Sequence, residues 1–426
     1  SGIPQELQAV AKTAMLVDIL DFSKAIFDKQ FGLTSVLKVS LESGKWPQRA
    51  LGSIVEINPG SANPVDLFGN DDFVYIDIAS VEGGTGVIDF SQSIKSIEAP
   101  GRARRVIAEG DVLLSTVRPN LKAFAIARDL PERVLASTGF SVLRVKKNLI
   151  FEKYLLEILF SEFLQEQMIA KMGKGQYPSI NQDDIKSLLI PLPELSVQNK
   201  IVAECNTVDE EVLRAKEQIS KNRSKINIEI KKISGSFSSL KNVALINPSK
   251  SELRNIADDV LISFVEMSAV SEFGYIDHSE VKKLGLLRKG GYTCFAENDI
   301  LIAKITPCME NGKCALATGL ENGIGMGSTE FHVIRADKER VLPAFLFKLL
   351  NREEIRHRAA QVMTGSSGHR RVPASFYESL EVPLPSLSEQ SVLVAQFEAL
   401  EKKIAEAQAV IDSAPARKQA ILEKYL

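Results

Sequence analysis

The chain has 426 residues, of which 45% are hydrophobic and 25% charged, a composition typical of a folded globular protein rather than a disordered one. Its net charge of -2 excludes a chain that is basic throughout, so composition alone counts against nucleic acid unless Lys and Arg gather locally. Four scattered cysteines and the lack of a long apolar run predict a reduced, cytoplasmic protein without a disulfide framework, zinc site or membrane span.

The N-terminal segment, residues 1–45, is predicted to be helical. Apolar side chains return every three or four positions between Met15 and Phe27, which is the spacing of one helix face. Gly32 and Gly44 then interrupt the pattern. This segment lies outside the repeat that follows, and its pattern leaves open whether it packs on the long helices or binds a partner.

The rest of the chain is an internal repeat, which a proline-containing phrase marks twice. Ile190-Pro-Leu-Pro-Glu-Leu-Ser-Val-Gln198 returns 192 positions later as Val382-Pro-Leu-Pro-Ser-Leu-Ser-Glu-Gln390. Prolines separated by one residue require an extended chain, and each phrase leads into a segment with helical spacing. We expect Ser196 and Ser388 to cap these two helices.

Both helical segments carry a narrow apolar stripe between charged flanks. Apolar or small residues follow one another at steps of mostly three and four from Ile201 to Ile233, and again from Leu393 to Ile411. This spacing predicts a coiled-coil seam, so we expect the two helices to pair with each other, antiparallel, with Asn222 as a seam residue that fixes their register. The alternative is that each helix lies separately on the protein surface.

A globular domain precedes each long helix. The chain is thereby divided into an N-terminal segment (1–45), a first domain (46–193), a first long helix (194–234), a second domain (235–385) and a second long helix with a C-terminal tail (386–426). Small changes in offset between the two domains are what duplication followed by loop insertion leaves. Three further anchors align them at offsets of 189, 188 and 191: Ile57-Asn-Pro59 with Ile246-Asn-Pro248, Ala108-Glu-Gly-Asp-Val-Leu113 with Ala296-Glu-Asn-Asp-Ile-Leu301, and Ser137-Thr-Gly-Phe140 with Ser328-Thr-Glu-Phe331.

Short β-branched segments separated by Gly, Asn and Asp predict strands of a mixed or antiparallel sheet in each domain. Helical patterns follow the last strand, over Glu152 to Lys171 and over Pro343 to Met363. The predicted fold class is therefore α+β, with two similar domains separated by a pair of long antiparallel helices in a pseudo-two-fold repeat. The predicted strands are Phe73 to Ile78, Val112 to Val117, Phe140 to Val145, Leu261 to Val265, Ile300 to Ile305 and Phe331 to Ile334.

The sequence offers no catalytic, nucleotide-binding or metal-binding constellation. The Asn-Pro dipeptides at 58–59 and 247–248 are followed by Gly60 and Ser249, so they lack the second proline and the aromatic residue of an amino-methyltransferase motif and are interpreted as turns. The four histidines have no partnered nucleophile, and the carboxylates have no metal-ligand spacing. We therefore expect no catalytic residue, metal or cofactor in this chain.

Basic and polar side chains recur in the loops of both domains, where they suit contacts with phosphates and base edges. Any one of them is ordinarily a solvated surface charge, but the set occurs twice, with Lys122 and Lys313 in register. Arginines precede the Glu-Gly-Asp turn of the first domain, as Arg288 and Lys289 precede the Glu-Asn-Asp turn of the second. The predicted nucleic-acid-binding residues are Arg102, Arg104, Arg105, Arg118, Asn120, Lys122, Lys174, Gln176 and Tyr177 in the first domain, and Arg288, Lys289, Lys304, Thr306, Asn311, Lys313, Ser366, Ser367, His369, Arg370 and Arg371 in the second.

These features together resemble the specificity (S) subunit of type I restriction–modification systems, from about Trp46 to Leu426. The resemblance rests on the two Pro-Leu-Pro phrases with their helices, the repeated Glu-x-Asp segments and the terminal Lys418-Gln-Ala-Ile-Leu-Glu-Lys-Tyr-Leu426. It implies two target-recognition domains, each reading one half of a bipartite site on double-stranded DNA, and long helices that set the spacer and dock two methyltransferase (M) subunits.

The same resemblance implies that the chemistry lies in the partners. S-adenosylmethionine would bind to the M subunits, which extrude the target base, and motor-nuclease (R) subunits would join for cleavage. The segment before Trp46 departs from the family pattern. The alternative function is a protein-interaction scaffold with duplicated domains and incidental basic loops, which salt-dependent retention on duplex DNA would distinguish. An enzyme with an unfamiliar active site is a third hypothesis, and the missing cofactor motifs count against it.

Overall fold

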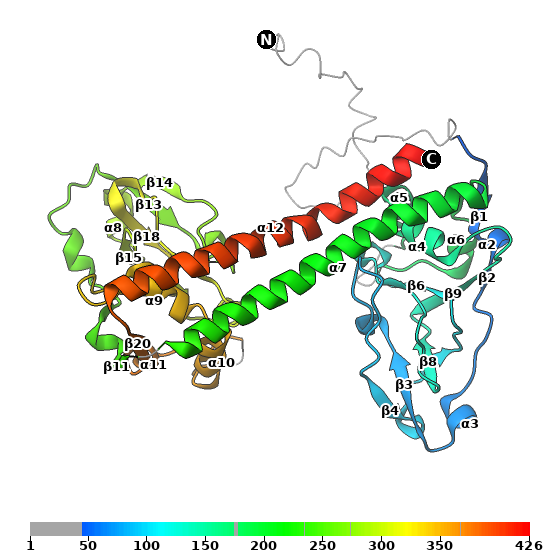
Figure 1. The fold of residues 1–426 in the computed structure, drawn as a ribbon, viewed down its shortest axis with the longest axis horizontal. Helices are drawn as coiled ribbons and strands as arrows, with labels where there is room; N and C mark the ends of the chain where they lie inside the picture. The colour runs from blue at the N-terminus through cyan, green and yellow to red at the C-terminus, as the bar shows by residue number, and fades with distance from the viewer. Residues whose placement is uncertain (1–44, 174–177, 234, 273, 367) are drawn as a thin grey trace, which may run out of the picture. The chain divides into compact units, whose positions relative to one another are not determined.

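The computed structural model describes residues 45–173, 178–233, 235–272, 274–366 and 368–426, so the predicted helical segment before residue 45 lies outside them. The chain divides into two compact units. The first combines residues up to Val208 with Pro415–Leu426, and the second is Asp209–Ala414 (Figure 1). Each unit contains an α+β domain and part of two long helices, α7 (Leu195–Lys232) and α12 (Leu387–Tyr425). The segment expected as a C-terminal tail is thus helical to Tyr425.

The domain of the first unit contains two four-stranded sheets rather than one. The sheet with strand order β2-β9-β6-β7 is antiparallel, whereas β4-β3-β8-β5 includes one parallel pair, β3 with β8. A short ribbon pairs β1 with β10. The strands are β1 Gln48–Ala50, β2 Val55–Ile57, β3 Asp72–Ile76, β4 Ser93–Lys95, β5 Ala103–Arg105, β6 Val112–Ser115, β7 Phe124–Ile126, β8 Val134–Ser137, β9 Phe140–Val145 and β10 Leu189–Pro191.

The second unit repeats this topology strand for strand. Its antiparallel sheet is β12-β19-β16-β17, its mixed sheet is β14-β13-β18-β15, and its ribbon pairs β11 with β20. This agreement confirms the predicted internal repeat and α+β class. The strands are β11 Ser236–Ser239, β12 Ala244–Ile246, β13 Leu261–Val265, β14 Glu280–Lys283, β15 Thr293–Ala296, β16 Ile300–Ala303, β17 Cys314–Leu316, β18 Ile324–Gly327, β19 Phe331–Ala336 and β20 Glu381–Leu384.

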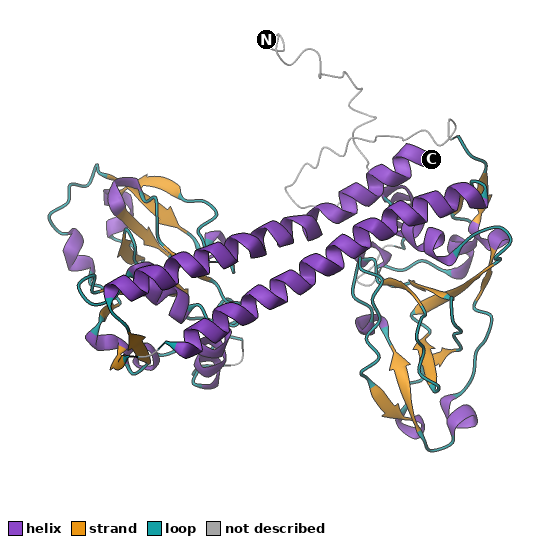
Figure 2. Ribbon diagram, in the orientation of Figure 1, coloured by secondary structure: helices purple, strands orange, loops and turns teal. Residues whose placement is uncertain are grey.

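The helical segments that follow β9 and β19 each divide into two helices. In the first unit Ser161 has an extended backbone, and its hydroxyl accepts a hydrogen bond from the Leu164 N–H, so one helix ends there and another begins. In both units the first helix of the pair packs between the antiparallel sheet and the long helices (Figure 2). The shorter α-helices are α2 Leu51–Ile54, α3 Pro64–Phe68, α4 Glu152–Phe160, α5 Glu162–Lys171, α6 Gln182–Lys186, α8 Leu284–Arg288, α9 Pro343–Leu350, α10 Glu353–Gln361 and α11 Ala374–Glu378.

Within each unit, a length of α7 lies beside a length of α12 (Figure 1). The residue numbers of the packed positions rise along α7 as they fall along α12, so the helices are antiparallel, as the apolar stripes predict. Shared buried clusters join Ile201 to Leu422 in the first unit, and Ile219 to Ala407 and Ile230 to Phe397 in the second.

Both long helices begin one residue before the serines that were expected to cap them, so the predicted caps Ser196 and Ser388 are wrong. In α12 the cap is Ser386, whose hydroxyl accepts a hydrogen bond from the Glu389 N–H at 3.3 Å. The Glu389 carboxylate accepts one in return from the Ser386 N–H at 2.8 Å, which completes a capping box.

Asn222 occupies the helix seam but lacks the contact that would fix a register. It is 5% exposed, and its Nδ2 has no hydrogen-bond partner in the part of the chain that the structure describes. A seam polar residue specifies register when it bonds to a polar group opposite it. Here the amide instead leaves a buried donor unsatisfied, which costs stability.

Candidate nucleic-acid interface

The repeated Ala-Glu-x-Asp segment builds the same buried ion pair in both units. Asp111 and Asp299 are each 1% exposed. Arg144 on β9 donates its Nε and Nη2 to Asp111 at 2.9 and 2.8 Å, and Arg335 on β19 donates the same atoms to Asp299 at 2.8 and 2.7 Å. These two-pronged charged hydrogen bonds raise the pKa of both arginines and tie two strands of the antiparallel sheet together.

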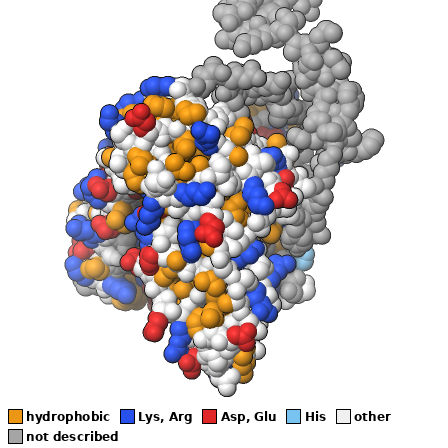
Figure 3. Space-filling view, turned by 90° about the vertical axis from the view of Figure 1, so that its right-hand side faces the viewer, with side chains coloured by type: hydrophobic (Ala, Val, Ile, Leu, Met, Phe, Trp, Pro, Cys, Tyr) orange, Lys and Arg blue, Asp and Glu red, His pale blue; other side chains and the backbone are white. Residues whose placement is uncertain are grey.

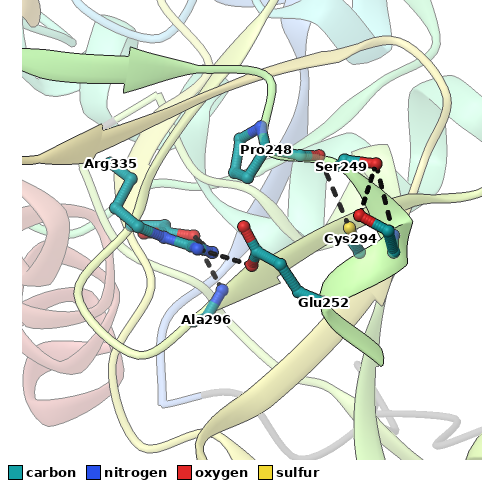
Figure 4. A network of polar contacts seen from close by, with 8 residues as sticks. Pro248, Ser249, Glu252, Cys294, Ala296 and Arg335 are labelled. Atoms are coloured by element: carbon teal, nitrogen blue, oxygen red, sulfur yellow. Dashed lines mark hydrogen bonds and ion pairs between the residues drawn. The ribbon is translucent and has the colours of Figure 1, made fainter. Parts of the chain in front are cut away.

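The Asp299 pair belongs to a larger network at one end of the sheet. The Ala296 N–H donates to the Asp299 carboxylate at 2.7 Å, and Arg335 also contacts Glu252 at 2.6 Å. Figure 4 shows Arg335 directed toward Glu252, with the Cys294 thiol beside them donating to the Pro248 carbonyl. This network fixes the segment after β12 against β15 and β19.

Both Asn-Pro dipeptides form bends, in keeping with their interpretation as turn residues, and each is clamped to the equivalent strand of its own unit, β9 or β19. Asn58 and Asn247 both have a left-handed backbone with φ of 55°. Each accepts a hydrogen bond through its side-chain oxygen from the N–H of the facing valine, Val142 or Val333, at 3.0 and 3.1 Å. Each also donates its own N–H to that valine's carbonyl at 2.7 Å. Asparagine tolerates this conformation better than most residues, which explains why it stands there twice.

The glutamine that ends each Pro-Leu-Pro phrase is fully buried and joins the long helix to its domain. Gln390 accepts a hydrogen bond from the Leu342 N–H at 2.8 Å and donates to the Arg340 and Pro385 carbonyls at 3.1 and 2.9 Å. Gln198 makes the three corresponding contacts in the first unit. The Asp–Arg pair, the asparagine that is clamped to a valine (the asparagine clamp) and the buried glutamine thus occur at equivalent places in both units. We call these shared contacts the frame.

Several predicted nucleic-acid-binding residues also hold backbone carbonyls of their own unit. Lys122 donates its Nζ to the Phe160 carbonyl at 3.0 Å, and Lys313 donates its Nζ to the Met267 carbonyl at 3.0 Å. These two lysines, which align in the repeat, thus each have a structural role in their own unit. Arg104 likewise donates to a carbonyl of its own loop at 3.3 Å.

The basic residues that precede the two turns do not stand on equivalent elements. Ala103 on β5 pairs with Ser137, and the strand in the equivalent place is β15, where Thr293 pairs with Gly327. Arg288 instead ends helix α8, where it contacts Asp258 at 2.7 Å and two backbone carbonyls. Sequence order placed both basic groups before the turn, but they stand on different elements.

Three segments of the second unit bring predicted residues together. The Lys304 N–H donates to the Glu330 carbonyl at 2.9 Å, the Val372 N–H donates to the Lys304 carbonyl at 2.9 Å, and the Thr306 N–H donates to the Arg370 carbonyl at 3.0 Å. The loop after β16, the turn before β19 and the loop before α11 are therefore held edge to edge. We call this group, Lys304, Thr306, Glu310, Glu330, Arg370 and Arg371, the loop junction.

The two arginines of the loop junction are ion-paired but still accessible. Arg371 contacts Glu330 at 2.8 Å, and Arg370 contacts Glu310 at 2.9 Å. Their side chains are 45% and 43% exposed. The Arg371 guanidinium lowers the pKa of the Glu330 carboxyl by hydrogen bonding to it. Each arginine thus retains N–H groups that a ligand could reach.

The first unit has a surface pocket of about 480 Å³, and the second unit has one of about 340 Å³ beside the loop junction. The second pocket is lined by Lys250, Tyr292, Lys304 and Thr329, among others. Lys250 donates its Nζ to the Gly290 carbonyl at 2.6 Å, which holds its charge at the rim. Ammonium and hydroxyl groups around an open pocket are suited to a phosphate backbone or a base edge.

The first unit joins its loops in the same way with different side chains. The Ile180 N–H donates to the Thr116 carbonyl at 2.9 Å, and the Thr116 N–H donates to the Gly139 carbonyl at 2.8 Å. A guanidinium lies beside these loops as well, but it comes from β5. Arg105 donates its Nε to the Phe140 carbonyl at 3.3 Å. Burial lowers the pKa of Arg105.

The other predicted residues lie on the surface or outside the described chain. Basic and acidic side chains are interspersed over the face drawn in Figure 3. Sequence reasoning missed Glu330 and Lys250, although Glu330 is the point at which the second Ser-Thr-x-Phe anchor departs from the first. The exposed residues are Arg102, Arg118, Asn120, Lys289, Asn311, Ser366 and His369, whereas Lys174, Gln176, Tyr177 and Ser367 lie outside the described residues.

His332 connects Asn247 to the loop before α11. It is 5% exposed, its Nδ1 accepts from the Asn247 amide at 3.2 Å, and its Nε2 donates to the Val372 carbonyl at 2.8 Å. Burial lowers its pKa below the usual 6.5. As the pH falls, the imidazole of the unfolded chain therefore takes up a proton before that of the folded chain does. The contribution of neutral His332 to stability is thus complete above pH 6.5 and is lost as the pH falls below it.

We expect the unfolding midpoint of the second unit in urea to fall between about pH 7.5 and 5.5, and His332→Gln to weaken that dependence. His357, whose side chain is 74% exposed, provides the matched control, and His357→Gln is expected to leave the dependence unchanged. An equal effect of the two substitutions would contradict the assignment.

Neither a metal site nor a membrane-spanning helix is found among the residues that the structure describes. No three His, Cys, Asp or Glu side chains of this part of the chain lie where they could hold a metal ion, and none of its helices is long and apolar enough to cross a membrane.

Comparison with known proteins gives a family and a fold. Residues 43–222 and 236–412 match the family model described as "Type I restriction modification DNA specificity domain". The chain is 32% identical over 261 residues to the type I restriction enzyme EcoEI specificity subunit of Escherichia coli, which covers 57% of this chain and 43% of the relative. It is 40% identical over 162 residues to the EcoAI specificity subunit of the same organism, covering 38% of this chain and 27% of the relative. The chain thus spans less than half the length of these two relatives.

More distant proteins match nearly the whole chain. A putative type I restriction enzyme MjaX specificity subunit from Methanocaldococcus jannaschii is 24% identical over 419 residues, covering 91% of this chain and 93% of the relative. A chain solved in work on "complex assembly and conformational transition of the type I R-M system" has a TM-score of 0.53 at 22% identity, covering 89% of this chain and 97% of that one. This last likeness concerns the fold.

Proposed function

Because the chain belongs to the family of type I restriction–modification DNA specificity domains, whose model matches it twice, we propose that each domain reads one half of a bipartite site on double-stranded DNA. One observation carries the proposal. The two domains share their frame residue by residue, whereas the side chains at the joined loops differ. Two readers of unlike sequences would require this combination, because base edges are distinguished by the side chains that reach them.

The differences at the joined loops can be followed through equivalent backbone hydrogen bonds. Lys304 takes the place of Thr116, and Glu330 takes the place of Gly139. Arg371 takes the place of Ser179, because each forms an isolated bridge with the loop after the equivalent strand. We infer that these positions, and not the recurring ones, determine which bases are read.

The long helices are proposed to set the spacer between the half-sites and to dock the methyltransferase (M) subunits. A helix of 38 residues is about 57 Å long. Leu213 and Ile228 on α7 and Val392 on α12 are 59%, 50% and 58% exposed, so apolar side chains are available to a protein partner. In this proposal the M subunits carry S-adenosylmethionine and the chemistry, motor-nuclease (R) subunits join for cleavage, and this chain supplies recognition without catalysis.

Duplex DNA binding tests the proposal directly. With M subunits present, we expect a complex whose affinity falls steeply as salt rises, because phosphate contacts release counterions. Bound duplexes selected from a randomised pool should share a motif in two parts. Binding without a shared motif, or no binding at low salt, would contradict the proposal.

Arginine substitutions in the two units should affect different halves of that motif. Arg105→Ala removes the guanidinium beside Phe140 in the first unit, and Arg370→Ala removes one from the loop junction of the second. We expect each to lower the preference at positions of one half only, by roughly tenfold. Equal loss in both halves from either variant would show that the assignment of one half-site to each unit is wrong.

A further inference from the structure

The internal repeat separates residues that hold the fold from residues added for recognition. The Asp–Arg pair, the asparagine clamp and the buried glutamine occur in both units with the same partners. The ion pair between Glu330 and Arg371 does not, because Gly139 and Ser179 stand at the equivalent positions. The first unit joins the equivalent loops by the equivalent backbone hydrogen bonds without this pair, so the fold does not require it.

The Glu330–Arg371 contact fixes the direction of one guanidinium. Glu330 accepts from the Nε of Arg371 at 3.0 Å and from its Nη2 at 2.8 Å, and the His369 carbonyl accepts from its Nη1 at 3.1 Å. A guanidinium has five N–H groups, so one N–H on each terminal nitrogen remains. The carboxylate occupies one side of the planar group, and the remaining N–H of each terminal nitrogen is left for a ligand.

Hydrogen bonds of its own backbone hold Glu330 in place. Its N–H donates to the Ser328 hydroxyl at 3.2 Å, and its carbonyl accepts the Lys304 N–H at 2.9 Å. It stands on the turn that leads into β19, whose next residue, Phe331, is 1% exposed. The carboxylate therefore projects from a turn anchored directly to the sheet, whereas Arg371 belongs to a loop.

We propose that Glu330 is a positioning residue that aims Arg371 at a guanine in the half-site read by the second unit. This inference rests on the proposed function in DNA recognition. Guanine presents two acceptors, O6 and N7, in the major groove, and a fixed guanidinium fork matches them. A carboxylate near DNA also repels phosphates, so Glu330 lowers binding to DNA that offers no guanine at this place.

The test uses the full chain assembled with its M subunits and a duplex pool with randomised positions. Bound duplexes are sequenced for the wild type, Glu330→Gln, Arg371→Gln and the double variant. We expect Glu330→Gln to lower the preference for a G·C pair at one position by roughly tenfold, at the position that Arg371→Gln also affects. The double variant should lose no more than Arg371→Gln, and binding of random duplex at low salt should not weaken in Glu330→Gln.

Glu280→Gln provides a matched control, because Glu280 forms a surface ion pair with Lys282 at 2.8 Å on β14. It is expected to select the wild-type motif. If Arg371→Gln does not assemble, Arg371→Lys replaces it, since lysine keeps the charge but loses the fork.

The possible failures are distinguishable. A wild-type complex that selects no two-part motif would overturn the proposed function. A wild-type motif together with an unchanged motif for Glu330→Gln would overturn this inference alone. So would a loss spread over both halves, or a loss at a position that is not a G·C pair.

Discussion

Replacing Asp299 with alanine is expected to lower the free energy of unfolding of the second unit by about 3 kcal/mol or more. The substitution leaves the Arg335 guanidinium, 28% exposed, paired with Glu252 alone among the described residues, and removes the acceptor of the Ala296 N–H. Removing one member of a buried pair is costly because the other charge keeps its desolvation penalty. Urea unfolding followed by circular dichroism measures the loss.

Asp258→Ala is the control for this prediction. Asp258 also pairs with an arginine, Arg288, at 2.7 Å, but its side chain is 71% exposed. An exposed pair contributes on the order of 1 kcal/mol or less, so this variant should unfold almost as the wild type does. Fluorescence of Trp46, the single tryptophan and a residue of the first unit, should be unaffected by either variant at low urea. Similar losses from the two aspartates would refute the assignment of Asp299 to the frame.

Gln390→Ala is expected to have an effect of similar size on the second unit. The variant leaves the Leu342 N–H and the Arg340 and Pro385 carbonyls without the fully buried side chain that bonds to them. Unsatisfied buried groups cost on the order of 1 kcal/mol or more each, so a loss of about 3 kcal/mol is expected. Hydrogen exchange of the α9 amides should accelerate as well, because the lost contact lies at the start of that helix.

The matched variant is Gln408→Ala on the same helix. Gln408 makes a solvent-exposed hydrogen bond with Asp412, one turn further along the helix. Side-chain pairs with this spacing contribute about 0.2–0.5 kcal/mol. A change within about 0.5 kcal/mol is expected. If Gln390→Ala were equally mild, the glutamine of the repeated phrase would have no structural role.

The architecture was predictable because periodicity and repetition are properties of the sequence itself. The apolar steps from Ile201 onward predict the long helix and its antiparallel partner, and the four anchors predict two domains of one topology. Strand pairing was harder, because the two sheets of each domain are assembled from segments far apart in the chain. β3 and β6 are both short and mostly apolar, yet they lie in different sheets.

The candidate site was predicted less completely than the fold. Recurrence in both domains predicts that Lys122 and Lys313 bind DNA, and in the structure each also holds a carbonyl of its own unit. Recurrence marks what the two units share, and the frame is what they share. The informative positions are those at which one copy departs from the other, as Glu330 does from Gly139. Which loops meet could not be read from the sequence, because their contacts run between the turn before β19 and segments about 40 residues further along the chain.

The asparagine clamp has a consequence for how such a domain can change. Asn58 and the valine it holds are 84 positions apart, whereas the same two residues of the second unit are 86 apart, and the Asp–Arg partners are separated by 33 and 36 positions. Insertions have thus accumulated between bonded residues without breaking the bonds. A loop that is a few residues longer or shorter between these fixed points should therefore be tolerated, provided that both ends of each clamp are kept.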